Sequence, residues 1–305
     1  MWWRAIGPVA LAITTCRMAG QAASATTEGR GPLLTLVLRH DGLDRETRLQ
    51  ALPRRGERVP LVILIHCSTD TPDGIASRSG FDRLAAKEGF YLAMPEVAGP
   101  KRGWTAHPAI FGKTKPPSDD IGYFRALIER LVDAYPVDPK RIYVVGHLSG
   151  GMMAYRLAAE MADVFAGVGV VNATIGVEAT KTGLKSRVPR PSRSMPVVAF
   201  HGWSNEVLPY DGGRGSRGNR AYMSVNESID FWKHVNGCQE RGTPERFGSR
   251  DTVRITYPSP DGRADVVLFK LPKANHEWPR AIVGERGEKT TVAELMWAFL
   301  SRQSR

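Results

Sequence analysis

Residues 146–151, with the sequence Gly-His-Leu-Ser-Gly-Gly, have the composition of a sharp turn between a strand and a helix. In catalytic turns of this type, small residues flank a serine whose strained backbone exposes its hydroxyl for attack on an ester carbonyl. Counted from Gly146, the central residue here is Leu148, and Ser149 follows one position later. Because a leucine side chain has no nucleophilic atom, we predict that the turn forms without the hydroxyl that covalent catalysis requires.

The segments around this turn alternate between apolar runs and amphipathic stretches, a pattern typical of a mostly parallel sheet with helices on both faces. Strands are predicted at residues 33–38, 47–52, 61–66, 90–94, 142–145, 165–171, 197–201, 253–257 and 266–271. Helices are predicted at residues 81–88, 152–161, 225–235 and 290–300, together with one that Asp119 or Asp120 caps and that ends near Tyr135. The sequence shows no repeat or linker, so residues 26–305 are predicted to form a single α/β domain.

The composition is that of an ordinary globular protein. Of the 305 residues, 42% are hydrophobic and 24% are charged, which excludes intrinsic disorder and collagen-like chains. Residues 1–25 have the features of an export signal, with Arg4 near the start, an apolar run at 5–16 and small residues at 23–25. The apolar run is shorter than the roughly 20 residues that cross a bilayer. We therefore predict a secreted or periplasmic protein with no permanent membrane span.

The net charge is +11, and cleavage of the signal would lower it to +9 by removing Arg4 and Arg17. Basic residues cluster at 181–193 and 214–220, where they either attract an anionic polymer or surface, or belong to a solvated loop. Nucleic acid is not an expected partner, because the protein is predicted to be exported and lacks a basic motif interleaved with aromatic residues. Cys67 and Cys238 can pair only if their Cα atoms lie within about 7 Å, which the sequence leaves open.

Several longer motifs are spread over nearly the whole mature chain. They include DDIGY at 119–123, PVDPKRIYV at 136–144, GGMMAYRLA at 150–158 and HEWP at 276–279, with others at 61–66, 81–85, 88–90, 201–202, 209–213 and 236–238. In these motifs the chain resembles the secreted poly(3-hydroxybutyrate) depolymerase and feruloyl or acetylxylan esterase-like family of α/β-hydrolases. The resemblance implies an α/β-hydrolase fold with a serine ester hydrolase site and no cofactor.

The same resemblance implies that three of the four functional positions have changed. The family's nucleophilic serine falls on Leu148, its triad aspartate on Asn205 and the glycine of its oxyanion loop on Cys67. The triad histidine is kept as His276. Leu148 removes the attacking oxygen, and Asn205 removes the carboxylate that orients the histidine and stabilises its imidazolium. These losses predict a site that is weakly catalytic or not catalytic.

A shifted triad is the alternative. Ser149 and Glu206 each follow the expected position by one residue, and with His276 they would rebuild a triad, since glutamate serves as the acid in some α/β-hydrolases. Against this, a slip of one residue at a strand end turns a side chain to the other side unless the backbone bulges.

The residues expected to line the substrate cleft are His66, His147, Trp104 and Trp278. For the two tryptophans, ordinary packing at the rim is an equally good interpretation. The histidines lack the spacing of metal ligands, so no metal site is expected.

Two functional hypotheses follow from these residues. In the first, a divergent member of the family binds an ester-containing polymer or a small ester in a remnant cleft, with little or no turnover. In the second, an active serine ester hydrolase acts on hydroxyalkanoate or hydroxycinnamoyl esters through Ser149, Glu206 and His276. The changes at Leu148 and Asn205 favour the first.

Overall fold

The computed structural model describes residues 31–52, 56–97, 103–107, 118–247, 252–279, 281–283 and 289–305. The predicted export signal at 1–25 lies outside these residues. In the part of the chain that is described, no helix is long and apolar enough to cross a membrane. Cys67 and Cys238 are both free, so they do not form a disulfide with each other.

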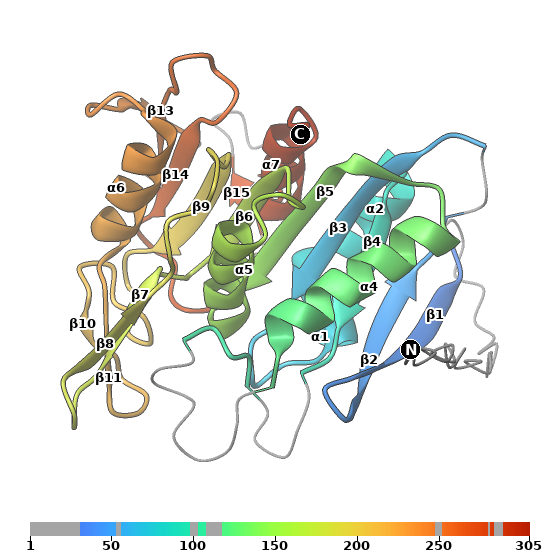
Figure 1. Cartoon of the computed structure of the whole chain (residues 1–305). Coiled ribbons are helices and arrows are strands. Elements are labelled where there is room, and N and C mark those ends of the chain that lie inside the picture. The colour runs from blue at the N-terminus through green and yellow to red at the C-terminus, as the bar shows by residue number, and fades with distance from the viewer. Residues whose placement is uncertain are drawn as a thin grey trace, which may run out of the picture.

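A ten-stranded sheet runs through the middle of the molecule (Figure 1). Its order is β1 (Leu33–His40), β2 (Leu43–Gln50), β4 (Tyr91–Pro95), β3 (Val59–Ile65), β5 (Val137–His147), β6 (Gly167–Val171), β9 (Val197–Gly202), β14 (Val266–Leu271), β13 (Val253–Tyr257) and β12 (Thr243–Arg246). All pairs from β4 to β14 are parallel, whereas the pairs at both edges are antiparallel. This confirms the predicted mostly parallel sheet.

The described helices divide between the two faces of this sheet, as predicted. One face is covered by α4 (Asp120–Ala134), α5 (Ser149–Glu160) and α6 (Val225–Asn236), and the other by α1 (Pro72–Ser79), α2 (Phe81–Glu88) and α7 (Val292–Leu300). Helix α4 begins where the sequence predicts, because the Asp119 carboxylate accepts the Gly122 N–H at 2.9 Å.

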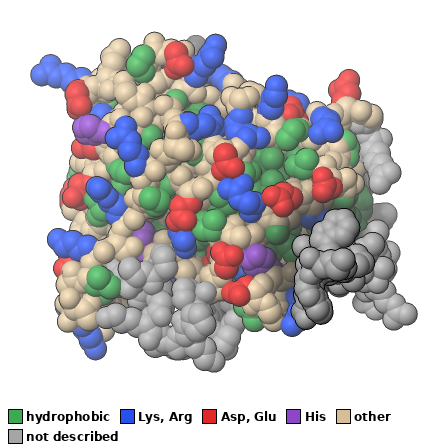
Figure 2. Space-filling model, in the orientation of Figure 1, with side chains coloured by type: hydrophobic (Ala, Val, Ile, Leu, Met, Phe, Trp, Pro, Cys, Tyr) green, Lys and Arg blue, Asp and Glu red, His purple; other side chains and the backbone are tan. Residues whose placement is uncertain are grey.

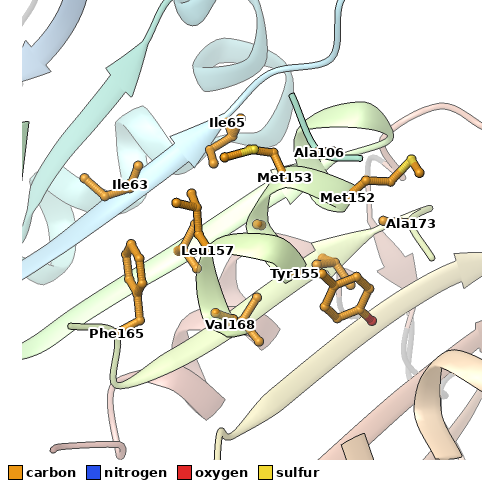
Figure 3. Close-up of a cluster of buried hydrophobic side chains, with 14 of the residues drawn as sticks. Ile63, Ile65, Ala106, Met152, Met153, Tyr155, Leu157, Phe165, Val168 and Ala173 are labelled. Carbon is orange, nitrogen blue, oxygen red and sulfur yellow. The ribbon is translucent and has the colours of Figure 1, made fainter. Parts of the chain in front are cut away.

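Successive side chains of β3 point to opposite faces of the sheet and divide the core into two layers. Ile63 and Ile65 join the layer under α4 and α5, whereas Val62 and Leu64 join the layer under α1 and α2. Figure 3 shows the first layer beneath α5, where Met152, Met153, Tyr155 and Leu157 of the helix lie with Val168 of β6 and with Phe165, which precedes that strand. Burial on both faces explains why β3 is apolar throughout.

A second, four-stranded sheet was not predicted. Its order is β10 (Gly213–Arg214), β11 (Arg220–Tyr222), β7 (Gly176–Ala179) and β8 (Leu184–Arg187), all antiparallel. The sequence of these segments indicates basic loops, because short strands rich in polar and charged residues lack the alternation that marks a half-buried strand. Strands β15 (Ile282–Val283) and β16 (Lys289–Thr290) form a separate short pair.

A buried ion pair joins β2 to the start of α4. The Arg45 guanidinium donates to the Asp120 carboxylate at 2.8 Å, and both side chains are 1% exposed. Asp120 also accepts the N–H of Thr105 at 2.7 Å, and Arg45 lies 3.9 Å from the centre of the Tyr123 ring. Each charge is therefore compensated only by groups inside the protein.

Asp120→Asn is expected to lower the free energy of unfolding by about 3–5 kcal/mol, because it leaves the Arg45 charge buried without a counter-ion. Urea unfolding monitored by circular dichroism measures the change. The control is Asp44→Asn in the exposed Arg39–Asp44 pair, whose charged atoms are 3.0 Å apart and where the loss should stay below about 1 kcal/mol. Equal losses in the two variants would contradict this interpretation.

Candidate active site

The turn between β5 and α5 places Leu148 at its summit. Leu148 has φ 50° and ψ −118°, one of three positive φ values among the described residues other than glycine. Its N–H donates to the Val171 carbonyl at 3.0 Å. A Cβ added at Gly146 would lie 2.2 Å from the Gly150 carbonyl oxygen, and one at Gly150 would lie 2.3 Å from that of Ile65. Only glycine allows this close approach, so the strained conformation is imposed on residue 148 by its neighbours.

Ser149 is the first residue of α5, one position beyond the summit. Its side chain is half-buried, and its Oγ accepts the N–H of Ser68 at 3.0 Å. Ser68 lies in the loop between β3 and α1, the loop that supplies an oxyanion donor in α/β-hydrolases. The hydroxyl of Ser149 is therefore bonded to a backbone amide of that loop.

Asn205 and Glu206 lie in the loop after β9. Asn205 is buried, and its Oδ1 accepts the N–H groups of Val207 and Leu208, both at 3.0 Å. Its Nδ2 lies 3.4 Å from Nε2 of His201, which bonds the Leu208 carbonyl at 2.9 Å. Glu206 is exposed. The amide of Asn205 thus serves to hold the turn of its own loop.

His276 lies in the loop that follows β14, and its ring is half-buried. Asn172 Nδ2 donates to the carbonyls of Asn275 and Glu277 at 3.1 Å each, and Nε2 of His147 lies 2.9 Å from the His276 carbonyl. Sequence reasoning missed Asn172, which follows β6 with φ 55°, a conformation that asparagine tolerates better than most residues. These contacts fix the backbone of the His276 loop.

The structure does not join the members of the shifted triad by contacts. Among the described residues, the His276 ring makes no hydrogen bond or ion pair with Ser149, Glu206 or Asn205. The triad stays a prediction that requires rearrangement of these loops.

The four residues expected to line the cleft are buried, at 0–4% exposure. Trp104 donates its indole N–H to the His66 carbonyl at 2.8 Å, and Trp278 packs edge-on against His147 and Phe81. His66 also lies 3.2 Å from the Glu96 carboxylate. In this structure these side chains are packed against other protein groups. For the two tryptophans this agrees with the packing interpretation, although they are buried more deeply than a rim position implies.

Cys67 is also buried, and its Sγ lies 3.3 Å from the Thr69 hydroxyl. Across the described part of the chain, no group of three or more His, Cys, Asp or Glu side chains is arranged to hold a metal ion.

Comparison with known proteins places the chain in a family. Residues 51–214, more than half of the chain, match the family described as esterase PHB depolymerase. The chain belongs to this family. NocK of Nocardia uniformis subsp. tsuyamanensis, provisionally named an esterase, is 28% identical over 299 residues, covering 91% of this chain and 83% of NocK. Feruloyl esterase B of Piromyces equi is 27% identical over 222 residues, covering 71% of this chain and 39% of that protein.

Solved structures agree on the fold. Acetyl xylan esterase from Aspergillus awamori superposes with a TM-score of 0.60 at 13% identity, covering 89% of this chain and 99% of that one. A thermostable esterase superposes with a TM-score of 0.55 at 16% identity, covering 90% of this chain and 63% of that one. Together with the sheet order, these similarities show an α/β-hydrolase fold, as the family resemblance implied.

The strain at Leu148 is measurable. Leu148→Gly is expected to be about 1 kcal/mol more stable than Leu148→Ala, because only glycine adopts this backbone conformation freely. The matched control is Leu157, buried inside α5, where glycine should be about 1 kcal/mol less stable than alanine. Urea titrations of the four variants give the free energies of unfolding. The same order at both positions would show that Leu148 is unstrained.

Burial lowers the pKa of His147 and of His201 to about 4 each. For His107, burial together with the nearby Arg156 and Arg220 also lowers the pKa to about 4. These histidines bind protons in the unfolded chain near pH 6.5 but stay neutral in the native protein until about pH 4. Their contribution to stability is complete above pH 6.5 and is lost as the pH falls.

The free energy of unfolding should therefore decrease between pH 6.5 and pH 4, by about 1.4 kcal/mol per pH unit for each histidine. Urea unfolding at pH 7, 6 and 5 tests this. His147→Gln should remove one such contribution and flatten the slope. A wild-type stability that does not change between pH 7 and pH 5 would contradict the prediction.

Proposed function

We propose that this chain binds an ester-containing polymer or a small ester at the family's site, without the family's serine-dependent hydrolysis. The observation that carries the proposal is the leucine at the summit of the β5–α5 turn. The backbone there has the strained geometry that presents a nucleophile, while the side chain it presents is a hydrocarbon, 8% exposed. An acyl-enzyme requires an oxygen or sulfur atom at this point.

Two other features of the site support the proposal. Asn205 has no charge with which to stabilise an imidazolium at His276, and its side-chain oxygen is used by two backbone amides. In addition, the Ser149 hydroxyl holds the Ser68 amide, a group that could otherwise donate to a developing oxyanion. Attack, charge stabilisation and oxyanion binding are thus each weakened at a different residue.

The second candidate is an active ester hydrolase that uses Ser149, Glu206 and His276. It is favoured by one observation, a half-buried serine hydroxyl directly beside the summit residue. For this mechanism Ser149 must release Ser68, and the loops must bring His276 and Glu206 together.

The proposal also takes the protein to be exported, and treats residues 26–305 as one domain. Strands of the one ten-stranded sheet come from positions between 33 and 271, which supports a single domain. Ester-bearing ligands are inferred from the names of the relatives, a feruloyl esterase and an acetyl xylan esterase.

Wild-type protein is expected to show no turnover of a short-chain nitrophenyl ester and no labelling by a serine-directed fluorophosphonate. The physical reason is the missing nucleophile at residue 148. Ser149→Ala is the control, and it should be indistinguishable from wild type in both assays. Labelling of wild type that disappears in Ser149→Ala would overturn the proposal and establish the second candidate.

Restoring the family's residues should restore activity. Leu148→Ser with Asn205→Asp is expected to hydrolyse the same ester at least about tenfold faster than wild type, since the two changes return the nucleophile and the acid. Adding Ser149→Ala should raise the rate further by freeing the Ser68 amide. Leu148→Ala with Asn205→Asp is the matched control and should stay inactive.

The binding half of the proposal is tested by sedimentation with insoluble poly(3-hydroxybutyrate) and with acetylated xylan. Wild type should cosediment with at least one of them under conditions where an unrelated basic protein does not. Failure to cosediment with either polymer would contradict the proposed polymer binding. It would not bear on the proposed absence of serine-dependent hydrolysis.

A further inference from the structure

The four-stranded sheet brings together two basic segments that lie apart in the sequence. In its register, Arg220 of β11 pairs with Ala179 of β7, and Glu178 of β7 pairs with Lys185 of β8. Residues 176–187 and 213–222 contain six basic residues and one acidic residue, Glu178. The exposed basic side chains are Lys181, Lys185, Arg187, Arg214 and Arg217.

This sheet forms one flank of the molecule. Figure 1 places β8 and β11 at the lower left, and Lys and Arg side chains are visible on that flank in Figure 2. The single acid is already paired, since Lys185 Nζ lies 3.5 Å from Glu178. The other exposed acidic residues near these basic side chains, Asp211 and Glu206, lie in the adjoining loop.

An exposed aromatic side chain lies near the same flank. Trp203 follows β9 directly and is 52% exposed. Among the described residues, the other exposed large hydrophobic side chains are Leu33 and Val37, which lie on β1 at the far edge of the main sheet. Trp203 stacks on the buried ring of Tyr210, with centroids 4.7 Å apart and planes at 25°. Nζ of Lys270 lies 6.0 Å from the Trp203 ring. The indole is therefore held in place by stacking on Tyr210, with much of its surface in solvent.

The loop that carries Trp203 contacts the hairpin that carries Arg214 and Arg217. Tyr210 precedes β10 by three residues. The N–H of Ser216, in the β10–β11 hairpin, donates to the Glu206 carbonyl at 2.8 Å. Gly215 approaches the same loop so closely that a Cβ there would lie 2.2 Å from the Val207 carbonyl oxygen. The loop carrying Trp203 and the basic hairpin are thus packed together.

We propose that this surface, formed by Trp203 and the basic residues of the four-stranded sheet, binds an acidic polysaccharide. The apolar C–H face of a pyranose ring stacks on the indole, and uronate carboxylates further along the polymer pair with the lysines and arginines. Trp203 lies in the same loop as Asn205 and Glu206, so this surface adjoins the proposed ester site. Binding of the polysaccharide through stacking and charge does not require ester hydrolysis.

A sugar polymer fits these residues better than two other polyanions. Successive bases of single-stranded nucleic acid stack on several aromatic side chains, whereas the described part of this surface offers one exposed indole. A membrane-binding surface requires an apolar face that enters the lipid, whereas the exposed residues of these strands are Lys185, Arg187, Gly213 and Arg214.

Affinity electrophoresis in gels containing polygalacturonate or neutral xylan tests the proposal. At low salt, wild type should bind polygalacturonate at least about tenfold more tightly than neutral xylan, and about 0.5 M NaCl should remove most of this preference by screening. Arg214→Gln with Arg217→Gln should weaken polygalacturonate binding about fivefold or more. The matched control, Arg130→Gln with Lys140→Gln, makes the same change of net charge at exposed positions in α4 and β5 and should have less than about a twofold effect.

Trp203→Ala separates stacking from charge. It should weaken binding of both polysaccharides, and its effect should persist at high salt, because dispersion contacts are not screened. Thermal melts show whether each variant is folded. The proposal is overturned if the two charge variants have equal effects, if Trp203→Ala binds like wild type, or if poly(dA) or anionic vesicles bind more tightly than polygalacturonate.

Discussion

The close approach of β5, α5 and the end of β3 is the constraint on which the rest of the site depends. Gly146 and Gly150 allow backbone atoms to meet at distances that any Cβ would prevent. Between these two contacts residue 148 has a positive φ of 50° even though its side chain is leucine. The turn is thus a property of the glycines around it. This explains how a leucine can occupy its summit.

Polar groups near the turn are used to hold loops. His147 bonds the backbone at His276, Asn172 bonds the carbonyls on either side of it, and Asn205 holds its own turn. In a catalytic triad, groups at such positions are oriented toward substrate and toward one another. Here they satisfy backbone donors and acceptors that burial would otherwise leave unpaired. The loops at the carboxyl edge of the sheet are consequently held by several independent bonds.

The sequence was sufficient to predict most of the main sheet and its helices, with the exception of β12 and α1, and the residue at the summit of the turn. Apolar runs such as β3 reveal buried strands, and the spacing of glycines around Leu148 reveals the sharp bend. It was not sufficient for the four-stranded sheet, whose strands are short, polar and paired across long separations. Nor did it predict that Trp104 and Trp278 are buried, because that depends on how loops close over the sheet.

The hydrogen bond from the Ser68 amide to the Ser149 hydroxyl bears on what a single substitution at the turn can change. If residue 148 were changed to serine alone, the amide side chain at 205 and this hydrogen bond would both remain. A single substitution at the summit therefore leaves the loop contacts of Asn205 and of Ser68 as they are.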